Sequence, residues 1–465
     1  MKLYNTLSRQ IETIQPLNPP KATVYTCGPT VYAYPHVGNW FTFIRYDFLI
    51  RTLKASGWQP KWVMNITDVG HLVSDADEGE DKLEKGARAE GKTAWEIADF
   101  YSDYFIKSLA RLNITRPDYL PKATDHIAEQ IELIQKLEAK DFTYTIDDGV
   151  YYDTHKFPHY TDFAQIDLDE QQATARVEHN PQKHSQTDFA LWKFSPSDSK
   201  RDMEWNSPWG KGFPGWHIEC SAMSMKYLGD TLDIHAGGID HLPVHHTNEI
   251  AQSEAVTGKR YANYWMHTNH VSVEGEKISK SLGNTITLED IEEKSIELEA
   301  FRLHVLESHY RTQSKFSWES LEAAQHRLKA LYSLADLRWQ PKASAHTSLD
   351  FEAETHKLIL LMQNDLDSPA VMASLNGIQD SLENSLLKDD QVSAFESFLR
   401  KSDELLGLGL MNRADISTEQ KRLLKTRQEA RKAKNWEVAD ELRQQLEAQK
   451  LGVRDTPFGA VWYYL

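Results

Sequence analysis

Two short motifs hold residues that suit the phosphates of a nucleotide. His36, Gly38 and Asn39 follow a buried strand and lie where a helix begins, so backbone N–H groups and the helix dipole would favour an anion there. Lys277 and Lys280 lie three residues apart on a glycine-bracketed loop, where they could close over a triphosphate and neutralise developing charge. Either motif alone is more typical of an ordinary helix start or a solvated loop. Together, in an α/β pattern, they favour an ATP site.

A second group of residues has the chemistry of metal ligands. Cys27 ends the first predicted strand, Cys220 lies in a predicted helix, and His245 and Glu249 have the spacing of neighbours on one helix face. Two thiolates, an imidazole and a carboxylate form a plausible zinc set. A free cysteine is usually a small core residue, however, and a lone His-x-x-x-Glu is usually a surface pair. Five of the 19 histidines fall between residues 217 and 246, which favours a site.

A glycine pair is expected at the end of a later strand. Gly237 and Gly238 would let a flat ligand approach the backbone, and Asp240 could accept hydrogen bonds from ribose hydroxyls. A glycine pair by itself is more often a turn. We therefore assign these residues to the expected ATP site only because the other two nucleotide motifs are also present.

The sequence pattern around these residues predicts an α/β core that positions them. Strands are expected at 22–27, 61–66, 232–235 and 264–266, and helices at 41–53, 93–112, 125–137, 216–228 and 245–256. Strands that alternate with helices predict a parallel sheet covered on both faces. Between about residues 144 and 205 the pattern breaks into short β-like pieces, which indicates an insertion. After about residue 287 the chain is helical, with the leucine spacing of a bundle.

Composition narrows the class of protein. A chain of 465 residues suggests about three domains. The net charge of −17 argues against a nucleic-acid partner, but residues 421–434 hold seven basic residues and one acid, a local patch that could meet RNA. No apolar run approaches the length of a membrane span, and the start lacks the layout of a signal peptide, so a cytoplasmic protein without membrane contact is expected.

The order and content of these motifs resemble one family. The H-x-G-N and K-x-S-K-S pair is similar to the two signatures of class I aminoacyl-tRNA synthetases. More narrowly, several segments resemble the cysteinyl-tRNA synthetase family. These are 25–32, 214–223, 245–253, 309–311 with 316–317, and 455–457 with Gly459 and Trp462.

The resemblance implies a fold and a domain order. It implies an α/β Rossmann-like parallel sheet split by an insertion, followed by an α-helical bundle and a small C-terminal domain. The expected boundaries are 1–143 and 211–266 for the two halves of the catalytic domain, 144–210 for the connective insertion, 267–300 for the loop domain, 301–410 for the bundle and 411–465 for an anticodon-binding domain.

The resemblance also implies an activity. The enzyme would join L-cysteine and ATP into cysteinyl-adenylate and pass the cysteinyl group to tRNA(Cys), with Mg²⁺ accompanying ATP and a monomer as the working form. Matching positions imply Cys27, Cys220, His245 and Glu249 as zinc ligands, Thr67 and Trp216 at the amino acid, Lys280 in the mobile loop, and Arg431, Trp436, Asp440 and Asp455 at the anticodon. The chemistry of the motifs adds His36, Gly38, Asn39, Lys277 and Lys280 as the expected catalytic residues, and Gly237, Gly238 and Asp240 with His36 and Lys280 at ATP.

Zinc would select the substrate rather than perform chemistry. Cysteine differs from serine by one atom, and zinc prefers a soft thiolate to a neutral hydroxyl. Because four protein ligands normally close a zinc site, the substrate sulfur must enter as a fifth ligand or displace one, and Glu249 is the expected weak ligand.

Three alternatives compete with this interpretation. A ligase that joins cysteine to a small amine would keep the zinc and the adenylation chemistry but would not use the basic segment and Trp436. A non-catalytic RNA-binding relative would not need Lys277 and Lys280, and a zinc hydrolase built on His245 and Glu249 fits poorly with two thiolate ligands.

Overall fold

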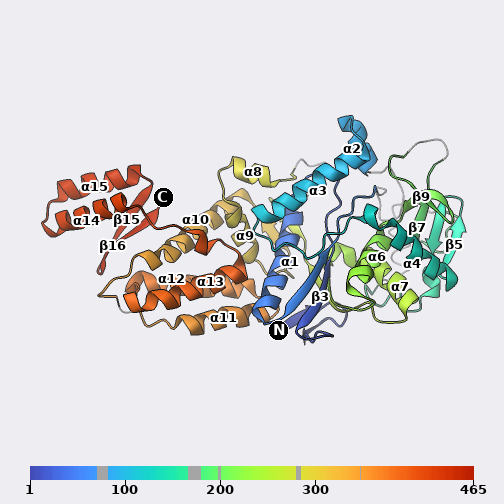
Figure 1. The fold of residues 1–465 in the computed structure, drawn as a ribbon, viewed down its shortest axis with the longest axis horizontal. Coiled ribbons are helices and arrows are strands. Elements are labelled where there is room, and N and C mark those ends of the chain that lie inside the picture. The colour runs from blue at the N-terminus through green and yellow to red at the C-terminus, as the bar shows by residue number, and fades with distance from the viewer. Residues whose placement is uncertain (71–81, 166–179, 197–200, 279–283, 346) are drawn as a thin grey trace. The chain divides into compact units, whose positions relative to one another are not determined.

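The structure, a computed structural model, describes residues 1–70, 82–165, 180–196, 201–278, 284–345 and 347–465 (Figure 1). The chain forms two compact units. One unit comprises Met1–Leu288 with Tyr310–Lys315, and the other comprises Glu289–His309 with Phe316–Leu465. The motifs for ATP and for the metal fall in the first unit, and the proposed anticodon residues fall in the second.

A four-stranded parallel sheet forms the centre of the first unit, in the order β11-β10-β3-β4. Its strands are β3 (Lys21–Thr26), β4 (Gln59–Met64), β10 (Leu232–Gly238) and β11 (Ala262–Thr268). Helices α1 (Val37–Ala55), α6 (Trp216–Leu228) and α7 (Thr247–Thr257) connect or precede these strands. The parallel sheet confirms the expected fold class, and it brings the carboxyl ends of β3 and β10 side by side.

Two boundaries differ from the sequence prediction at functional positions. Gly237 and Gly238 are the last residues of β10 rather than residues after it. Helix α7 begins at Thr247, because residues Leu242–His246 form a π-helical turn that contains His245. Single π-helical turns occur often at functional sites, since the wider turn reorients side chains.

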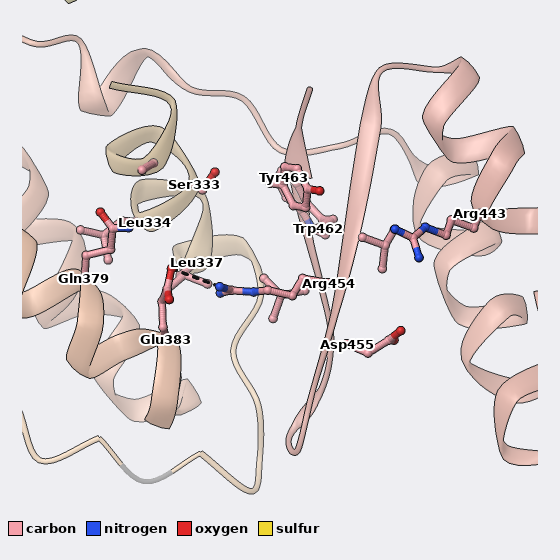
Figure 2. A pocket seen from close by; sticks show the side chains of 13 residues that line it. Ser333, Leu334, Leu337, Gln379, Glu383, Arg443, Arg454, Asp455, Trp462 and Tyr463 are labelled. Carbon is pink, nitrogen blue, oxygen red and sulfur yellow. Dashed lines mark ion pairs between the residues drawn. The ribbon is translucent and has the colours of Figure 1, made fainter. Parts of the chain in front are cut away.

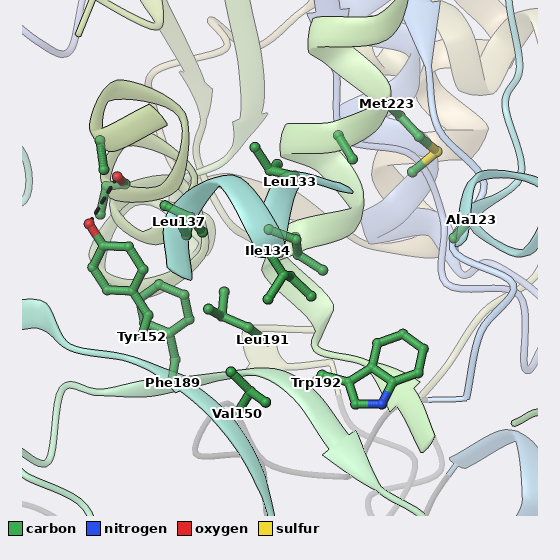
Figure 3. Close-up of a cluster of buried hydrophobic side chains, with 14 of the residues drawn as sticks. Ala123, Leu133, Ile134, Leu137, Val150, Tyr152, Phe189, Leu191, Trp192 and Met223 are labelled. Atoms are coloured by element: carbon green, nitrogen blue, oxygen red, sulfur yellow. Dashed lines mark hydrogen bonds between the residues drawn. The ribbon is translucent and has the colours of Figure 1, made fainter. Parts of the chain in front are cut away.

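The insertion forms a five-stranded antiparallel sheet in the order β5-β6-β7-β9-β8. The strands are β5 (Thr143–Ile146), β6 (Gly149–Tyr152), β7 (Phe189–Phe194), β8 (Trp205–Ser207) and β9 (Gly210–Pro214). Figure 3 shows that side chains of β6 and β7 pack with those of α4 (Ile127–Ala139) and α6. The insertion therefore shares its hydrophobic core with helices of the catalytic half, and that core lies beside α6, which carries Cys220.

Smaller elements complete the first unit. They are the hairpin β1 (Lys2–Asn5) with β2 (Gln10–Thr13), helices α2 (Lys82–Glu90) and α3 (Ala94–Arg111), and strands β12 (Val271–Val273) and β13 (Glu276–Lys277). Strands β12 and β13 pair with β14 (Ser314–Phe316) in a three-stranded sheet. This sheet leads directly into the Lys277–Ser281 segment.

The chain after residue 287 is helical, as the leucine spacing predicts. The helices are α8 (Leu288–Glu293), α9 (Leu298–Leu306), α10 (Trp318–Ala335), α11 (Phe351–Gln363), α12 (Ser368–Ser385), α13 (Val392–Leu406), α14 (Thr418–Lys432) and α15 (Trp436–Ala448). The predicted leucines of α10, from Leu321 to Leu334, are buried. A hairpin of β15 (Leu451–Thr456) and β16 (Gly459–Tyr464) closes a small core with α14 and α15. Within the described ranges, every helix is too short or too polar to cross a membrane.

Candidate functional site

The four predicted metal ligands converge on one point in the first unit. Cys27 directly follows β3, Cys220 lies on α6, His245 lies in the π-helical turn, and Glu249 lies on α7. One ligand atom from each residue lies within 4.8 Å of every other, and all four side chains are buried. Two sulfurs separated by nearly two hundred positions in sequence therefore share one pocket.

Glu249 is held by two donors and turns its other oxygen toward the cluster. His235 Nε2 lies 2.9 Å from Glu249 Oε2, and the Tyr261 hydroxyl donates to the same oxygen at 2.9 Å. Glu249 Oε1 is buried without a hydrogen-bond partner in the described chain and lies 3.3 Å from His245 Nε2. Burial by itself would raise the pKa of Glu249, but His235, His245 and the Tyr261 hydroxyl hold it below its usual value. The carboxylate is thus charged, with Oε1 beside His245 and without a hydrogen-bond partner in the described chain.

These observations fit a bound metal ion. Burial raises the pKa of the Cys27 thiol well above its usual value, with the neighbouring Cys220 as a further cause, and burial lowers the pKa of His245 well below its usual value. A neutral imidazole, two sulfurs and an oxygen without a hydrogen-bond partner are donors that a divalent cation satisfies. The arrangement therefore forms a candidate metal site.

An overlapping group of Cys27, His235, His246 and Glu249 has equally close donor atoms. Here, however, the Nε2 atom of each histidine already has a partner. His235 Nε2 is bound to Glu249 Oε2, and His246 Nε2 lies 3.2 Å from Cys27 Sγ. The set with Cys220 and His245 is therefore the better ligand set. His235 and His246 instead hold two of its members, Glu249 and Cys27.

A hydrogen-bonded series of side chains ends at the Cys27 sulfur. Thr6 Oγ1 lies 2.7 Å from His267 Nδ1, His267 Nε2 lies 2.8 Å from His246 Nδ1, and His246 Nε2 lies 3.2 Å from Cys27 Sγ. Burial lowers the pKa values of His246 and His267, the latter to about 3, so both rings are neutral. If Thr6 donates at one end, each ring accepts at Nδ1 and donates at Nε2, and the last N–H points at sulfur. Such a donor suits a thiolate.

Close packing explains why β10 ends in two glycines. A Cβ at Gly237 would lie 2.3 Å from His246 Cε1, and one at Gly238 would lie 2.3 Å from Asp240 Oδ1. The Asp240 side chain is 64% exposed, so its carboxylate is accessible to a ligand. Gly237 is therefore required for close packing whether or not a nucleotide approaches it.

The two residues expected at the amino acid flank the ligand cluster. Thr67 is buried and exchanges backbone hydrogen bonds with Pro29 and Val31, in the segment that follows Cys27. Its hydroxyl accepts a hydrogen bond of 3.0 Å from Asn65 Nδ2. The Trp216 ring, at the first position of α6, lies 4.7 Å from the His245 ring. Trp216 therefore lies beside the ligand His245, whereas Thr67 is bound to the segment that follows Cys27.

The H-x-G-N residues form the start of α1. His36 is the N-cap, and its backbone N–H donates to Asn39 Oδ1 at 3.0 Å, so the Asn39 side chain closes the first turn. A Cβ at Gly38 would lie 2.8 Å from Ile278 Cδ1 and 3.0 Å from His36 Cε1. Gly38 therefore permits Ile278 to approach the helix start closely.

The second lysine motif is only partly described. Lys277 ends β13, and Lys280 lies outside the described residues. The flanking residues both contact the first turn of α1, because Ile278 lies against Gly38 and the Ile286 carbonyl accepts a 2.8 Å hydrogen bond from the Val37 N–H. Ile278 and Ile286 thus both lie at the helix start that holds His36.

Three of the predicted anticodon residues lie together in the second unit. Arg431 pairs with Asp455 at 3.2 Å, and its guanidinium lies 5.4 Å from the centre of the Trp436 ring. Trp436 is 54% exposed, which suits stacking on a base. Sequence reasoning missed Arg427, which is buried and donates to both Asp455 oxygens at 2.9 and 2.8 Å. The Asp455 hydrogen bond raises the pKa of Arg427, and the charge of Asp440 adds to this effect.

A cavity of about 510 Å³ adjoins this group within the second unit. Figure 2 shows it between helices of the bundle and the β15–β16 hairpin, with Asp455 and Arg443 on one side. The ion pair of Arg454 with Glu383, at 3.1 Å, links the hairpin to α12.

The parallel sheet, split by an insertion, with the helix start at His36 beside it, is the fold of a class I aminoacyl-tRNA synthetase catalytic domain. Residues 13–326 match the family model described as tRNA synthetases class I (C) catalytic domain, and residues 413–462 match the one described as cysteinyl-tRNA ligase anticodon binding domain. The chain belongs to the cysteinyl-tRNA synthetase family, the cysteine–tRNA ligases.

Curated relatives are similar over nearly the whole chain. Cysteine–tRNA ligase 1 of Burkholderia lata is 43% identical over 470 residues, which cover 99% of this chain and 96% of the relative. The cysteine–tRNA ligase of Treponema denticola is 39% identical over 496 residues, with 99% of each chain covered.

Solved structures support the fold alone. The methionyl-tRNA synthetase of Mycobacterium tuberculosis, in complex with methionyl-adenylate, matches with a TM-score of 0.56 and 15% identity, over 83% of this chain and 89% of that one. The agnB2 LeuRS of Agrobacterium radiobacter K84, in a ternary complex with tRNA and LeuAMS, matches with a TM-score of 0.61 and 12% identity, over 85% of each chain.

Proposed function

We propose that this chain activates L-cysteine with ATP and transfers the cysteinyl group to tRNA(Cys), and that Cys27, Cys220, His245 and Glu249 hold a zinc ion that selects the substrate. The observation that carries the proposal is the convergence of these four donor atoms within 4.8 Å of one another. Family membership supplies the reaction, and the donor set supplies the means of telling cysteine from serine.

The donor chemistry supports zinc as the metal. Two thiolates, an imidazole and a carboxylate are typical zinc ligands, whereas magnesium and calcium prefer oxygen. When bound, zinc would supply a Lewis acid that binds a thiolate far better than a neutral hydroxyl. A pocket of ordinary groups would separate two substrates that differ by one atom by only about 1–3 kcal/mol.

The anchoring of Glu249 bears on how the substrate sulfur is accommodated. His235 and Tyr261 both hold Glu249 Oε2, so the carboxylate is restrained from swinging away. This restraint favours a site that keeps Glu249 when the substrate binds, against the expectation that Glu249 is the ligand displaced. Thr67 and Trp216 would then border the amino acid, one beside the Cys27 loop and the other beside His245.

Activation needs positioning and charge neutralisation rather than a protein nucleophile. A carboxylate oxygen of cysteine attacks the α-phosphorus of ATP, the bond to the β-phosphate oxygen breaks, and pyrophosphate leaves with its electron pair. His36, the first turn of α1 with Gly38 and Asn39, and the lysines at 277 and 280 would neutralise the phosphates. We propose further that Gly237, Gly238 and Asp240 border the nucleoside and that Mg²⁺ accompanies ATP.

The tRNA partner is assigned to the second unit. Arg431, Trp436, Asp440 and Asp455 would meet the anticodon, with Arg427 holding Asp455 in place. The match of residues 413–462 to an anticodon-binding domain weighs against the alternative of a ligase for a small amine. The domain boundaries expected from sequence, a monomeric state and a cytoplasmic location belong to the same proposal.

Cysteine-dependent exchange of labelled pyrophosphate into ATP tests the activation step. The wild type should show exchange, and Cys220→Ser should lose zinc and exchange together, because a hydroxyl is a poor ligand in place of a thiolate. Unimpaired exchange by the zinc-free variant would overturn the ligand assignment. Charging of unfractionated tRNA with cysteine tests the second step, and a protein that activates cysteine yet charges no tRNA would favour the small-amine ligase.

A further inference from the structure

A buried arginine on α1 connects the helix that starts at His36 to the sheet that carries the lysine segment. Arg45 is 1% exposed and lies eight residues after the first residue of α1, about 12 Å along the helix. Its Nη1 donates to the Asn269 carbonyl at 3.2 Å, and its Nη2 donates to Ser314 Oγ at 2.5 Å. These acceptors lie on two separate segments.

Both acceptors belong to the base of the three-stranded sheet. Asn269 lies between β11 and β12, and Ser314 is the first residue of β14. The two segments are also bound to each other, since the Ser314 N–H donates to the His270 carbonyl at 2.9 Å. Arg45 therefore fastens the sheet at the point where β12 and β14 meet.

The same helix contacts the sheet and its loop at other levels. Thr42 Oγ1 lies 3.2 Å from Thr268 Oγ1, the Val37 N–H donates to Ile286, and Gly38 lies against Ile278. The first turn of α1 thus contacts Ile278 and Ile286, and Arg45 binds the base of the sheet further along the same helix. A shift of the sheet along the helix would move Lys277 and Ile278 relative to His36.

The chemistry of Arg45 points to orientation rather than stability. A buried guanidinium loses hydration, and burial lowers the pKa of Arg45 to about 9. An apolar side chain of similar volume often serves stability as well as a buried charge does. A planar fork that donates to two segments at once instead fixes their mutual orientation.

We infer that Arg45 is a positioning residue for cysteine activation, which holds the β13-β12-β14 sheet so that Lys277, at the end of β13, and Ile278 keep their place beside the start of α1. This inference rests on the proposed function. Arg45 would touch neither substrate, and its effect would reach the reaction through the placement of Lys277.

Arg45→Lys tests the inference, because lysine keeps the charge but lacks the planar fork. The expected result is a fall of about 10- to 100-fold in kcat of cysteine-dependent pyrophosphate exchange, the range for a displaced catalytic group. KM for cysteine and zinc content should stay unchanged. Arg302→Lys is the matched control, because Arg302 is buried in the second unit and donates to the Leu406 carbonyl at 2.6 Å. It should lower thermal stability without changing kcat.

An Arg45→Lys enzyme with wild-type kcat, or an equal loss of kcat in both variants, would overturn the inference. If Arg45→Lys does not fold, Ser314→Ala removes one acceptor alone and should still lower kcat, and wild-type kcat in that variant would overturn the inference as well. Absence of cysteine-dependent exchange in the wild type would instead refute the proposed function, so the two failures are distinguishable.

Discussion

Tyr261 anchors the carboxylate of the metal site, and removal of its hydroxyl should weaken zinc binding. The hydroxyl donates to Glu249 Oε2 at 2.9 Å and lies 2.6 Å from Ser224 Oγ, all within the buried interior. Tyr261→Phe keeps the ring and the volume but deletes this donor. Glu249 Oε2 then keeps only the contact with His235 among the hydrogen bonds described above.

The magnitude follows from the charge of the acceptor. A hydrogen bond to a charged group contributes about 1.5–3 kcal/mol. At about 1.4 kcal/mol per tenfold change in an equilibrium constant, the zinc Kd should rise about 10- to 100-fold. Competition between the protein and a chromogenic zinc chelator measures this Kd directly.

Tyr152→Phe provides the matched control. Tyr152 is also buried, and its hydroxyl donates at 3.0 Å to the carbonyl of Ala251, which lies on α7 as Glu249 does (Figure 3). Its loss should lower stability and leave the zinc Kd unchanged, since Ala251 bears no ligand. Wild-type zinc affinity in Tyr261→Phe, or equal weakening in both variants, would refute the view that Tyr261 orients Glu249.

Two further predictions concern Asp68 and Arg427. Burial raises the pKa of Asp68 to about 6, although Thr124 donates two hydrogen bonds to its carboxylate. The folded protein therefore keeps Asp68 protonated at pH values at which the unfolded chain ionises it. The resulting contribution to the free energy of unfolding is full below about pH 4 and is lost as the pH rises through about 6, a change of up to about 3 kcal/mol. Urea unfolding should therefore show Asp68→Asn gaining stability relative to the wild type between pH 4 and pH 7, and the same difference at both pH values would contradict this. Arg427→Lys should raise KM for tRNA about tenfold, because Asp455 loses its bidentate partner. Pyrophosphate exchange should be unaffected. A charging assay that gives the wild-type KM would show that Arg427 has no part in tRNA binding.

Local patterns in the sequence predict the elements that carry the site. The run ending at Cys27 predicts β3, and the apolar periodicity of residues 216–228 predicts the whole of α6. Because parallel strands end at one edge of the sheet, Cys27 could be expected beside residues that follow β10. Residue chemistry alone predicts the ligand set as plausible, and the resemblance to a family strengthens it, because a free cysteine is more often a core residue and a His-x-x-x-Glu pair more often a surface pair.

Partners that meet only after folding could not be predicted. Tyr261 and His235 lie outside the spacing of any metal motif, yet both reach Glu249. Arg45 lies more than two hundred residues from its two acceptors, and no local pattern links them. The five histidines between residues 217 and 246 are the sequence signal for His235 and His246. That signal does not tell which histidines are ligands and which, like His235 and His246, contact the ligands Glu249 and Cys27.

The central claim is that zinc at Cys27, Cys220, His245 and Glu249 binds the thiol of the substrate. X-ray absorption spectroscopy of the zinc-loaded protein, with and without L-cysteine, tests it most directly. The free enzyme should show two sulfur ligands, from Cys27 and Cys220, and one additional sulfur should appear when cysteine binds but not when serine is added. A sulfur count that stays the same with saturating cysteine would show that zinc does not bind the substrate thiol.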